Sequence, residues 1–418
     1  MVVRTKKLLL LLVASVWTRP ASGFFVRPTG SHRRGGPTPT ARRPLASSAS
    51  TTTAKRTTTT PQGIGQALLN LALATPLWQY VLVPQARKKI VNTAEANGIP
   101  WNQSLEWIKA QNGPWNNVEN LVDENSNTPA YYQSQYHSYE KGNLCWEAAL
   151  EVELASCAVG ARNFPAYGPK GEEAFRGAFA GAFQELGALV PKHGIIVDLG
   201  CGTGMSTRPL AKSYPQAKQI IGFDLSPYFI AVGSTLLELE PKSFLEGGKW
   251  VSHIEYDERI DYRVGDASHT GLSDESVDVV NVQFIVHELP IEVSKQIMDE
   301  AYRILKPGGQ LWVGEMDFES PGYAAQRSNA LLFSLIRATE PFLDVYADGQ
   351  GELREYIAAK FSLTRVAAAT GRHFALCATK HQRGEDTSQP GQLFDDRFDE
   401  NNVYRQDDTH LKVWENKV

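Results

Sequence analysis

The sequence has few cysteines, and no two of them are spaced as metal ligands usually are. Four cysteines in 418 residues are too few for a disulfide-stabilised scaffold, and without a Cys-x-x-Cys pair a cysteine-ligated zinc site is not expected. Acidic residues are absent from residues 1–60, which hold eleven Lys and Arg. The rest of the chain therefore has a formal net charge of −15, which opposes general attraction to nucleic-acid phosphates.

Charge is also missing between Arg56 and Arg87, and most of this stretch, residues 64–83, is apolar. Its length nearly reaches that of a membrane span, but two glutamines, an asparagine and a proline interrupt it. We expect these residues to pack on the folded domain that follows. Peripheral contact with a lipid surface is the alternative.

The first sixty residues have the composition of a targeting segment. A basic start precedes a short apolar run at residues 8–17, small side chains at residues 21–23, and Phe24. An acid-free tract follows, and eighteen of the first sixty residues are Ser or Thr. This order resembles the bipartite presequence of algae with secondary plastids, which implies a disordered presequence and a plastid location. An ordinary secretory signal followed by a linker is the alternative.

A strand, a glycine turn and a helix are predicted near the middle of the chain. An apolar run at residues 195–199 precedes Gly200, Gly202 and Gly204, and a helical pattern follows. Glycines in such a turn let the backbone approach a ligand closely, and the following helix start offers free N–H groups. The dinucleotide-binding pattern GxGxxG would need a glycine at position 205, where the chain has Met205.

The pattern DxGxGxG at residues 198–204 resembles motif I of the class I S-adenosylmethionine-dependent methyltransferases. In that family the glycine turn accommodates the methionine part of the cofactor, and the acidic residue helps to hold its ammonium group. The resemblance therefore implies S-adenosylmethionine as the cofactor, with Asp198, Gly200, Gly202 and Gly204 among its contacts.

Three further strands end in residues that match the family. The strand at residues 219–223 leads to Asp224, twenty residues after Gly204, and a carboxylate there can accept hydrogen bonds from both ribose hydroxyls. The strand at residues 260–264 leads to Asp266 and Ala267, which match the adenine-binding pair of the family. The strand at residues 276–282 leads to Gln283 and Phe284. The resemblance thus adds these cofactor-binding residues: Asp224, Leu225, Asp266, Ala267, Gln283 and Phe284.

The remaining landmarks predict the fold. A helix at residues 291–305 ends in Lys-Pro-Gly-Gly before a strand at residues 310–315, and a hairpin at residues 361–379 supplies the last two strands. We expect an α/β, Rossmann-like, seven-stranded, mostly parallel sheet with an antiparallel last strand, helices on both faces and a helical N-terminal extension. The expected regions are a presequence at 1–60, a mainly helical extension with an aromatic lid at 61–169, a methyltransferase domain at 170–380 and a polar, solvated tail at 381–418.

Two places are candidates for contact with a methyl acceptor. His287 and Glu288 follow the fourth strand, and a histidine there has a suitable intrinsic pKa for proton abstraction. The alternative is that His287 caps a helix or lines the cofactor pocket and takes no part in the chemistry. The aromatic segment at residues 131–147, before the first strand, is typical of a lid, and we call it the lid. We expect Tyr136, His137 and Tyr139 of the lid to contact the acceptor. Ordinary packing of its aromatic rings is the alternative.

The sequence shows no spacing diagnostic of metal ligands, so no metal is expected. The predicted activity is methyl transfer to a small-molecule acceptor in the plastid, as in the branch that includes quinone- and tocopherol-methylating enzymes. A protein or RNA methyltransferase is an alternative, although the Asn/Asp-Pro-Pro-Tyr/Phe signature is absent after the fourth strand, where the chain has residues 283–286. The other alternative is a regulatory protein that binds the cofactor and has no activity.

Overall fold

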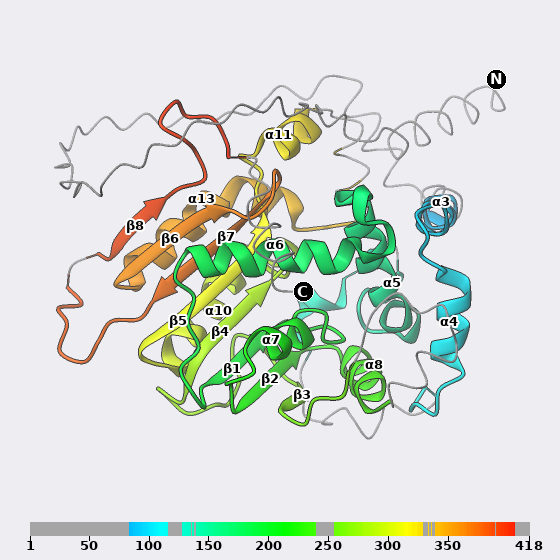
Figure 1. Cartoon of the computed structure of the whole chain (residues 1–418), viewed down its shortest axis with the longest axis horizontal. Helices are drawn as coiled ribbons and strands as arrows, with labels where there is room; N and C mark the ends of the chain where they lie inside the picture. Colours follow the sequence, from blue (N-terminus) through cyan, green and yellow to red (C-terminus); the bar gives the residue numbers. More distant parts are fainter. Residues whose placement is uncertain are drawn as a thin grey trace, which may run out of the picture. The chain divides into compact units, whose positions relative to one another are not determined.

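The described part of the chain forms an eight-stranded sheet with helices on both faces in a computed structural model (Figure 1). The predicted presequence and nearly all of the apolar segment at residues 64–83 lie outside the described part. The described residues are 83–115, 128–239 except Gln135 and Ser138, 255–328, Phe333, Ile336, 339–388 and 390–405.

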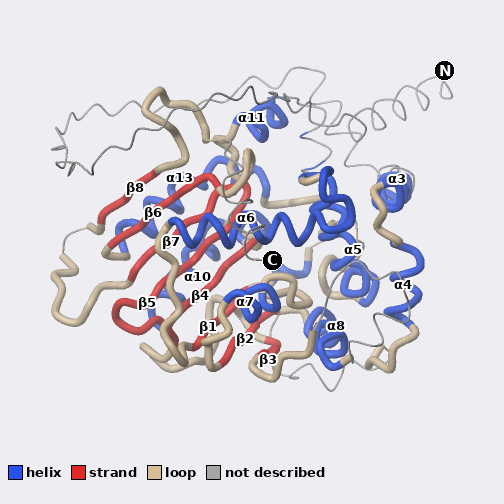
Figure 2. The backbone as a smooth tube through the Cα atoms, viewed as in Figure 1, coloured by secondary structure: helices blue, strands red, loops and turns tan. Residues whose placement is uncertain are grey.

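The strands follow the order β3-β2-β1-β4-β5-β7-β6-β8 across the sheet (Figure 2). β7 pairs antiparallel with β5 and with β6, and the other neighbouring strands are parallel. The predicted seven-stranded arrangement is confirmed, and β8 adds a strand that was not predicted. The bounds are β1 Ile195–Leu199, β2 Gln219–Asp224, β3 Ile260–Val264, β4 Val277–Gln283, β5 Leu305–Met316, β6 Leu363–Ala368, β7 His373–Thr379 and β8 Gln392–Asp395.

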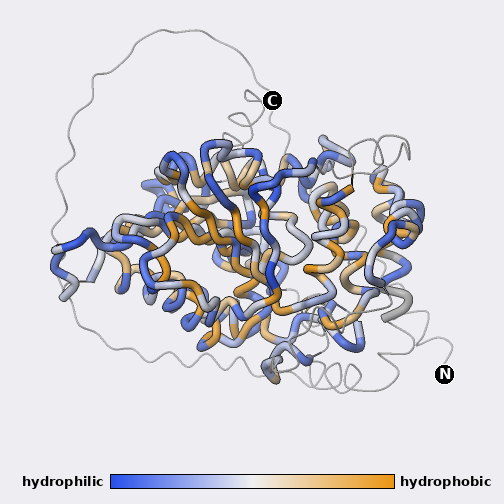
Figure 3. Tube along the Cα trace, turned by 90° about the horizontal axis from the view of Figure 1, so that it is seen from below, coloured by the Kyte–Doolittle hydropathy of each residue, from blue (hydrophilic) through white to orange (hydrophobic). Residues whose placement is uncertain are grey.

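Helices α6 (Gly171–Glu185) and α7 (Thr207–Ser213) cover one face of the sheet, and α10 (Ile291–Ile304) and α13 (Leu343–Lys360) cover the other (Figure 1). Phenylalanines recur every four residues along α6, so they share one stripe that packs around the fully buried Trp312 of β5. Hydrophobic residues are concentrated in the strands between these layers (Figure 3).

The N-terminal extension packs against this sheet domain. Its helices are α3 (Val83–Ala96), α4 (Trp101–Lys109) and α5 (Trp146–Asn163), and α5 also packs on α8 (Pro227–Glu238). Buried apolar residues from α4, α5 and α8 form one cluster, so the extension shares a core with the domain. Shorter helices are η2 Ala130–Gln133, η3 Pro165–Lys170, η4 Val286–Glu288 and α11 Pro321–Ser328.

The predicted polar tail at residues 381–418 is mostly solvent-exposed where it is described, but it is held against the sheet. β8 pairs with β6, and beyond it Arg397 and Tyr404 are buried. Arg397 contacts the carboxylates of Asp317 at 2.8 Å and Asp395 at 2.6 Å. Charges are buried when they are paired and hydrogen-bonded, and this pairing is invisible in a polar composition. Residues 406–418 lie outside the described part.

Among the described residues, none of the helices combines the length and the apolar character that a membrane crossing would need. The segment proposed for lipid contact, residues 64–83, is described only from Val83 onward.

Candidate active site

The glycine turn lies at the carboxyl end of β1, where open α/β sheets bind ligands. Gly200, Gly202 and Gly204 all have positive φ, at 72°, 56° and 98°. A Cβ on Gly204 would stand 1.8 Å from the hydroxyl of Tyr262, whereas a Cβ on Gly202 would have no described atom within 4 Å. Gly204 is therefore required by packing, and Gly202 borders the space in which a ligand is expected.

Asp224 ends β2, and its carboxylate is the main acceptor beside the turn. Oδ2 accepts a hydrogen bond from the Gly202 N–H at 2.9 Å, and Oδ1 accepts from the Ser226 N–H at 2.8 Å and the Tyr132 hydroxyl at 3.1 Å. Burial raises the pKa of Asp224 to about 6, although these hydrogen bonds favour the ionised form. A buried carboxylate that already accepts a hydroxyl hydrogen bond has the chemistry needed to hold a ribose diol.

Asp198 lies in β1 just before the glycine turn, and its predicted contact with the ammonium group of the cofactor stays a prediction. Its side chain is fully buried, and both of its carboxylate oxygens are already hydrogen-bonded within the protein. Oδ1 accepts from Asn281 at 2.7 Å, and Oδ2 accepts from Ser206 at 2.7 Å and Thr207 at 2.6 Å. Asp198 therefore joins the end of β1 to β4 and to the start of α7, and so holds the glycine turn in place.

Asp266 and Ala267 follow β3, beside Asp224 at the same edge of the sheet. The carboxylate of Asp266 accepts hydrogen bonds from the Ser268 N–H at 2.8 Å and the Ser268 hydroxyl at 2.7 Å through one oxygen, Oδ1. Leu225 is half-buried directly after β2. The structure thus brings the predicted ribose and adenine residues together.

The side chains of Gln283 and Phe284 contact neighbouring residues of the protein, and their predicted contact with the cofactor stays a prediction. The Gln283 amide donates to Asn281 at 2.9 Å and accepts from Arg176 of α6 at 3.1 Å. The Phe284 ring stacks on Phe175 of α6, with 5.3 Å between ring centroids. Phe284 has a φ of 59°, so the backbone turns sharply where β4 ends.

His287 is paired with a buried carboxylate. Its Nδ1 lies 2.9 Å from Oε2 of Glu315, a fully buried carboxylate on β5. Burial alone would lower the pKa of His287, but the Glu315 carboxylate and, to a lesser extent, Glu288 and Glu340 raise it to about 9. The raised pKa favours the protonated imidazole, whereas an Nδ1 held by a carboxylate is also the arrangement that orients histidine bases, so the catalytic role of His287 stays a prediction.

The lid segment is anchored by two of the three residues that we predicted to contact the acceptor. Tyr136 is 1% exposed and donates a hydrogen bond to the Glu288 carbonyl at 3.0 Å. Tyr139 donates to Glu151 of α5 at 2.7 Å. His137 is the exposed member, and its Nε2 lies 3.2 Å from Glu288 and 3.0 Å from Glu340.

Several residues of the site were not predicted. Tyr132 and Asn143 connect the lid to Asp224, Ser226 and Glu288, and Glu315 and Glu340 reach the same region from β5 and from the loop before α13. No sequence spacing indicates these contacts, because their partners lie 28 to 203 residues away along the chain. The density of tyrosines in the lid was the one available signal for Tyr132.

Comparison with known proteins agrees with this geometry. Residues 197–313 match the family model described as "Methyltransferase domain". This match covers 117 of the 418 residues, and over it the chain is similar to the class I S-adenosylmethionine-dependent methyltransferases. The predicted cofactor, S-adenosylmethionine, agrees with that similarity.

Curated relatives match the chain over part of their length. The demethylmenaquinone methyltransferase of Lactiplantibacillus plantarum is 32% identical over 116 residues, which cover 28% of this chain and 42% of the relative. The arsenite methyltransferase of Mus musculus is 23% identical over 178 residues, 42% of this chain and 45% of the relative. The chain thus spans less than half the length of these curated relatives.

Among solved structures, human N-acetylserotonin methyltransferase in complex with S-adenosylmethionine is 17% identical, with a TM-score of 0.35. That match covers 57% of this chain and 59% of the human chain. A predicted O-methyltransferase of Agrobacterium tumefaciens is 15% identical with a TM-score of 0.34, and the match covers 58% of this chain and 95% of that one.

The pKa of Asp224 predicts how cofactor affinity depends on pH. The ionised carboxylate is the acceptor for ribose hydroxyls, so affinity for S-adenosylmethionine should rise from pH 5 to pH 7 and level off above. Below a pKa of about 6 the expected slope is about tenfold per pH unit. Calorimetric titration at constant ionic strength measures it, and an Asp224→Asn variant should show a weaker, flatter profile. Constant wild-type affinity between pH 5 and 7 would contradict this assignment.

Proposed function

We propose that the chain transfers a methyl group from S-adenosylmethionine to a small-molecule acceptor in the plastid and releases S-adenosylhomocysteine. The observation that carries the proposal is the Asp224 carboxylate, buried at the carboxyl edge of the sheet and bonded to both the glycine turn and the lid. This arrangement joins a site for a diol to a segment that can cover an acceptor.

The bound cofactor supplies an electrophilic methyl group on a sulfonium. Gly202 lets the backbone approach it, Asp224 accepts the ribose hydroxyls, and Asp266 with Ala267 is placed for the adenine. The lid contributes by excluding water: Tyr132 bonds to Asp224, and Tyr136 bonds to the backbone after β4. Positioning and desolvation can supply most of the acceleration of a displacement at a methyl group.

The cysteine thiols of the chain are poorly placed to bind arsenite, so we propose an oxygen or carbon acceptor such as a quinol. Arsenic(III) is a soft centre that prefers several converging thiolates. Three of the four cysteines are buried, and burial raises the pKa of Cys377 to about 12. Cys145 is the partly exposed one, and burial raises the pKa of its thiol too. Of the two acceptors in the relatives' names, the demethylated quinone therefore agrees better with these residues.

The plastid location is proposed from the acid-free, Ser/Thr-rich composition of residues 1–60, with the secretory pathway as the alternative. A small acceptor, and not nucleic acid, is proposed from the net charge of −15 beyond those residues. Peripheral contact with a lipid surface through residues 64–83 would bring the enzyme close to prenylated acceptors, which partition into membranes.

Methyl-labelled S-adenosylmethionine tests the proposal. The full chain is incubated with it and with a plastid extract, or with a panel of reduced quinones, phenols and arsenite, and the label is separated into small-molecule, protein and RNA fractions. We expect label in the small-molecule fraction and in a quinol or phenol of the panel. Transfer to protein or RNA would replace the proposed acceptor class. Micromolar binding of S-adenosylmethionine without transfer to any fraction would favour a regulatory protein.

A further inference from the structure

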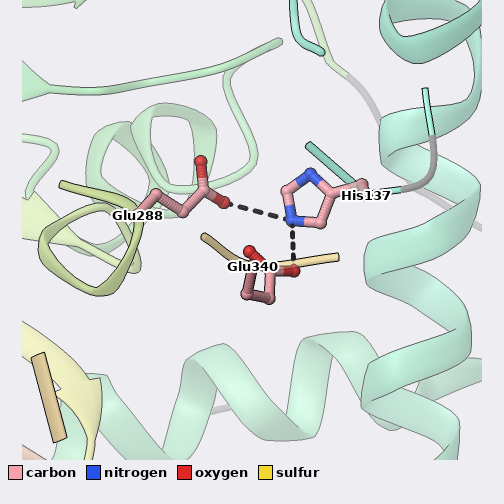
Figure 4. Close-up of side chains that lie close together, drawn as sticks. All are labelled: His137, Glu288 and Glu340. Carbon is pink, nitrogen blue, oxygen red and sulfur yellow. Dashed lines mark ion pairs between the residues drawn. The ribbon is translucent and has the colours of Figure 1, made fainter. Parts of the chain in front are cut away.

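Three segments that are far apart in the sequence meet at His137, Glu288 and Glu340 (Figure 4). His137 comes from the lid, Glu288 from η4 after β4, and Glu340 from the loop before α13. Nε2 of His137 lies 3.2 Å from Oε1 of Glu288 and 3.0 Å from Oε1 of Glu340. One donor atom from each residue lies within 4.8 Å of the others.

These separations match the edge of a metal coordination sphere. Around a six-coordinate ion with ligands at about 2.1 Å, adjacent ligand atoms are about 3.0 Å apart, and around a tetrahedral zinc ion with ligands at about 2.0–2.2 Å they are about 3.3–3.6 Å apart. The 3.0 Å separation between His137 and Glu340 matches the six-coordinate geometry, and the 3.2 Å separation between His137 and Glu288 lies between the two. A cation between the three side chains would therefore need only small side-chain shifts.

Two hydrogen bonds to backbone groups hold the three residues near one another, in addition to the contacts between their own side chains. The His137 N–H donates to the Thr339 carbonyl at 3.0 Å, which brings the lid beside Glu340. The Tyr136 hydroxyl donates to the Glu288 carbonyl at 3.0 Å. His137 itself has a φ of 50°, in a region that non-glycine residues seldom occupy, so its orientation is imposed by its surroundings.

Glu340 carries a second indication of a missing partner. Its Oε2 is buried, and no described residue donates a hydrogen bond to it. A buried carboxylate oxygen without a partner is costly, and a metal ion or a metal-bound water would satisfy it. By contrast, Oε2 of Glu288 accepts a hydrogen bond from the Asn143 side chain at 3.4 Å. Asn143 thus occupies the place of an outer-shell partner, which hydrogen-bonds to a metal-binding carboxylate.

We propose that His137, Glu288 and Glu340 bind a divalent first-row transition-metal ion where the lid, η4 and the loop before α13 meet. One imidazole and two carboxylates suit manganese, iron(II) or zinc, whereas a thiolate-selective ion would lack its ligands here. Three protein ligands leave coordination positions open, and the His137 side chain is 42% exposed, so these positions are accessible.

If the proposed methyl transfer is correct, an acceptor hydroxyl at an open position would be bound and acidified by the ion. This part rests on the proposed function, whereas the metal site does not.

Titration of the full chain, without an affinity tag, with Mn²⁺ tests the site, because electron paramagnetic resonance detects free Mn²⁺ directly and thiols bind it weakly. We expect one tight equivalent per chain, and a dissociation constant raised at least tenfold in the Glu340→Gln and His137→Gln variants. Glu292→Gln is the matched control, because this glutamate is 74% exposed and lies on the nearby α10; it should bind as the wild type does.

Failure of the folded wild-type chain to bind either Mn²⁺ or Zn²⁺ would overturn the proposal and leave the three residues as an ion-paired lid contact. Tight binding that survives both substitutions would also overturn it, because the ion would then sit elsewhere. Circular dichroism and S-adenosylmethionine binding on the same samples establish folding. If a variant does not fold, the melting temperature of the wild-type chain is measured with and without Mn²⁺. We expect Mn²⁺ to raise it, and an unchanged melting temperature would overturn the proposed site. Because cofactor binding is measured separately, loss of the metal site and loss of the proposed function are distinguishable.

Discussion

Replacing Arg397 with methionine is expected to lower the free energy of unfolding by about 3–5 kcal/mol, because it leaves buried charge without a partner. Nη1 of Arg397 contacts Asp317 at 2.8 Å and Glu319 at 2.7 Å, and Nη2 contacts Asp395 at 2.6 Å. The guanidinium is 4% exposed and the Asp317 carboxylate 0%. The same contacts hold β8 and the chain beyond it against the sheet, so their loss should also expose this segment to proteases.

Chemical denaturation measures this effect, and Arg383→Met is the matched control. The Arg383 side chain is 82% exposed and pairs with Glu275 at 3.0 Å, so its loss should cost no more than about 1 kcal/mol. Adding Asp317→Asn to Arg397→Met should recover part of the lost stability, because it removes the orphaned charge. A loss below about 1 kcal/mol for Arg397→Met would show that the C-terminal segment contributes little to the fold.

Replacing Asp224 with alanine is expected to weaken binding of S-adenosylmethionine by about 2–4 kcal/mol, or about 30- to 1000-fold, since one or two hydrogen bonds to a charged group are lost. The substitution also removes the acceptor for the Gly202 N–H and for the Tyr132 hydroxyl, which loosens the turn and the lid together. Calorimetric titration with S-adenosylmethionine and S-adenosylhomocysteine measures the loss.

Asp261→Ala is the control for that experiment. Asp261 lies on the neighbouring strand β3, its side chain is 41% exposed, and it pairs with Arg263. We expect this variant to bind the cofactor as the wild type does. A thermal unfolding curve separates a lost contact from a lost fold. If the folded Asp224→Ala variant kept wild-type affinity, the position of the cofactor would have to be reassigned.

The C-terminal segment illustrates where reasoning from the sequence failed. Residues 381–405 are mostly polar, and polarity without periodicity predicts a solvated tail. In the structure the pairing of β8 with β6 satisfies backbone groups, and Arg397 satisfies three carboxylates. A rule based on composition treats charge as exposed, whereas burial of charge depends on partners that are far away in the sequence.

The predictions for the acceptor side depend on distant neighbours in the same way. Tyr136, Tyr139 and His287 were selected because their side-chain chemistry suits a substrate or a proton. The structure uses the two tyrosines as anchors and surrounds His287 with carboxylates, which changes the charge that the imidazole carries at neutral pH. Local sequence identifies a reactive group, but its neighbours determine whether it can react.

The sequence alone determined the parallel sheet, the glycine turn and the two acidic strand ends that mark the cofactor site. Each of these is local: apolar runs of strand length, glycines where positive φ is needed, and a carboxylate at a strand end or two residues past it. Only the tertiary structure decided that Asp198 bonds to β4 and to the start of α7, that β8 joins the sheet, and that His137, Glu288 and Glu340 converge. Those outcomes depend on which distant segments pack together, and packing buries or pairs side chains in ways that no spacing records.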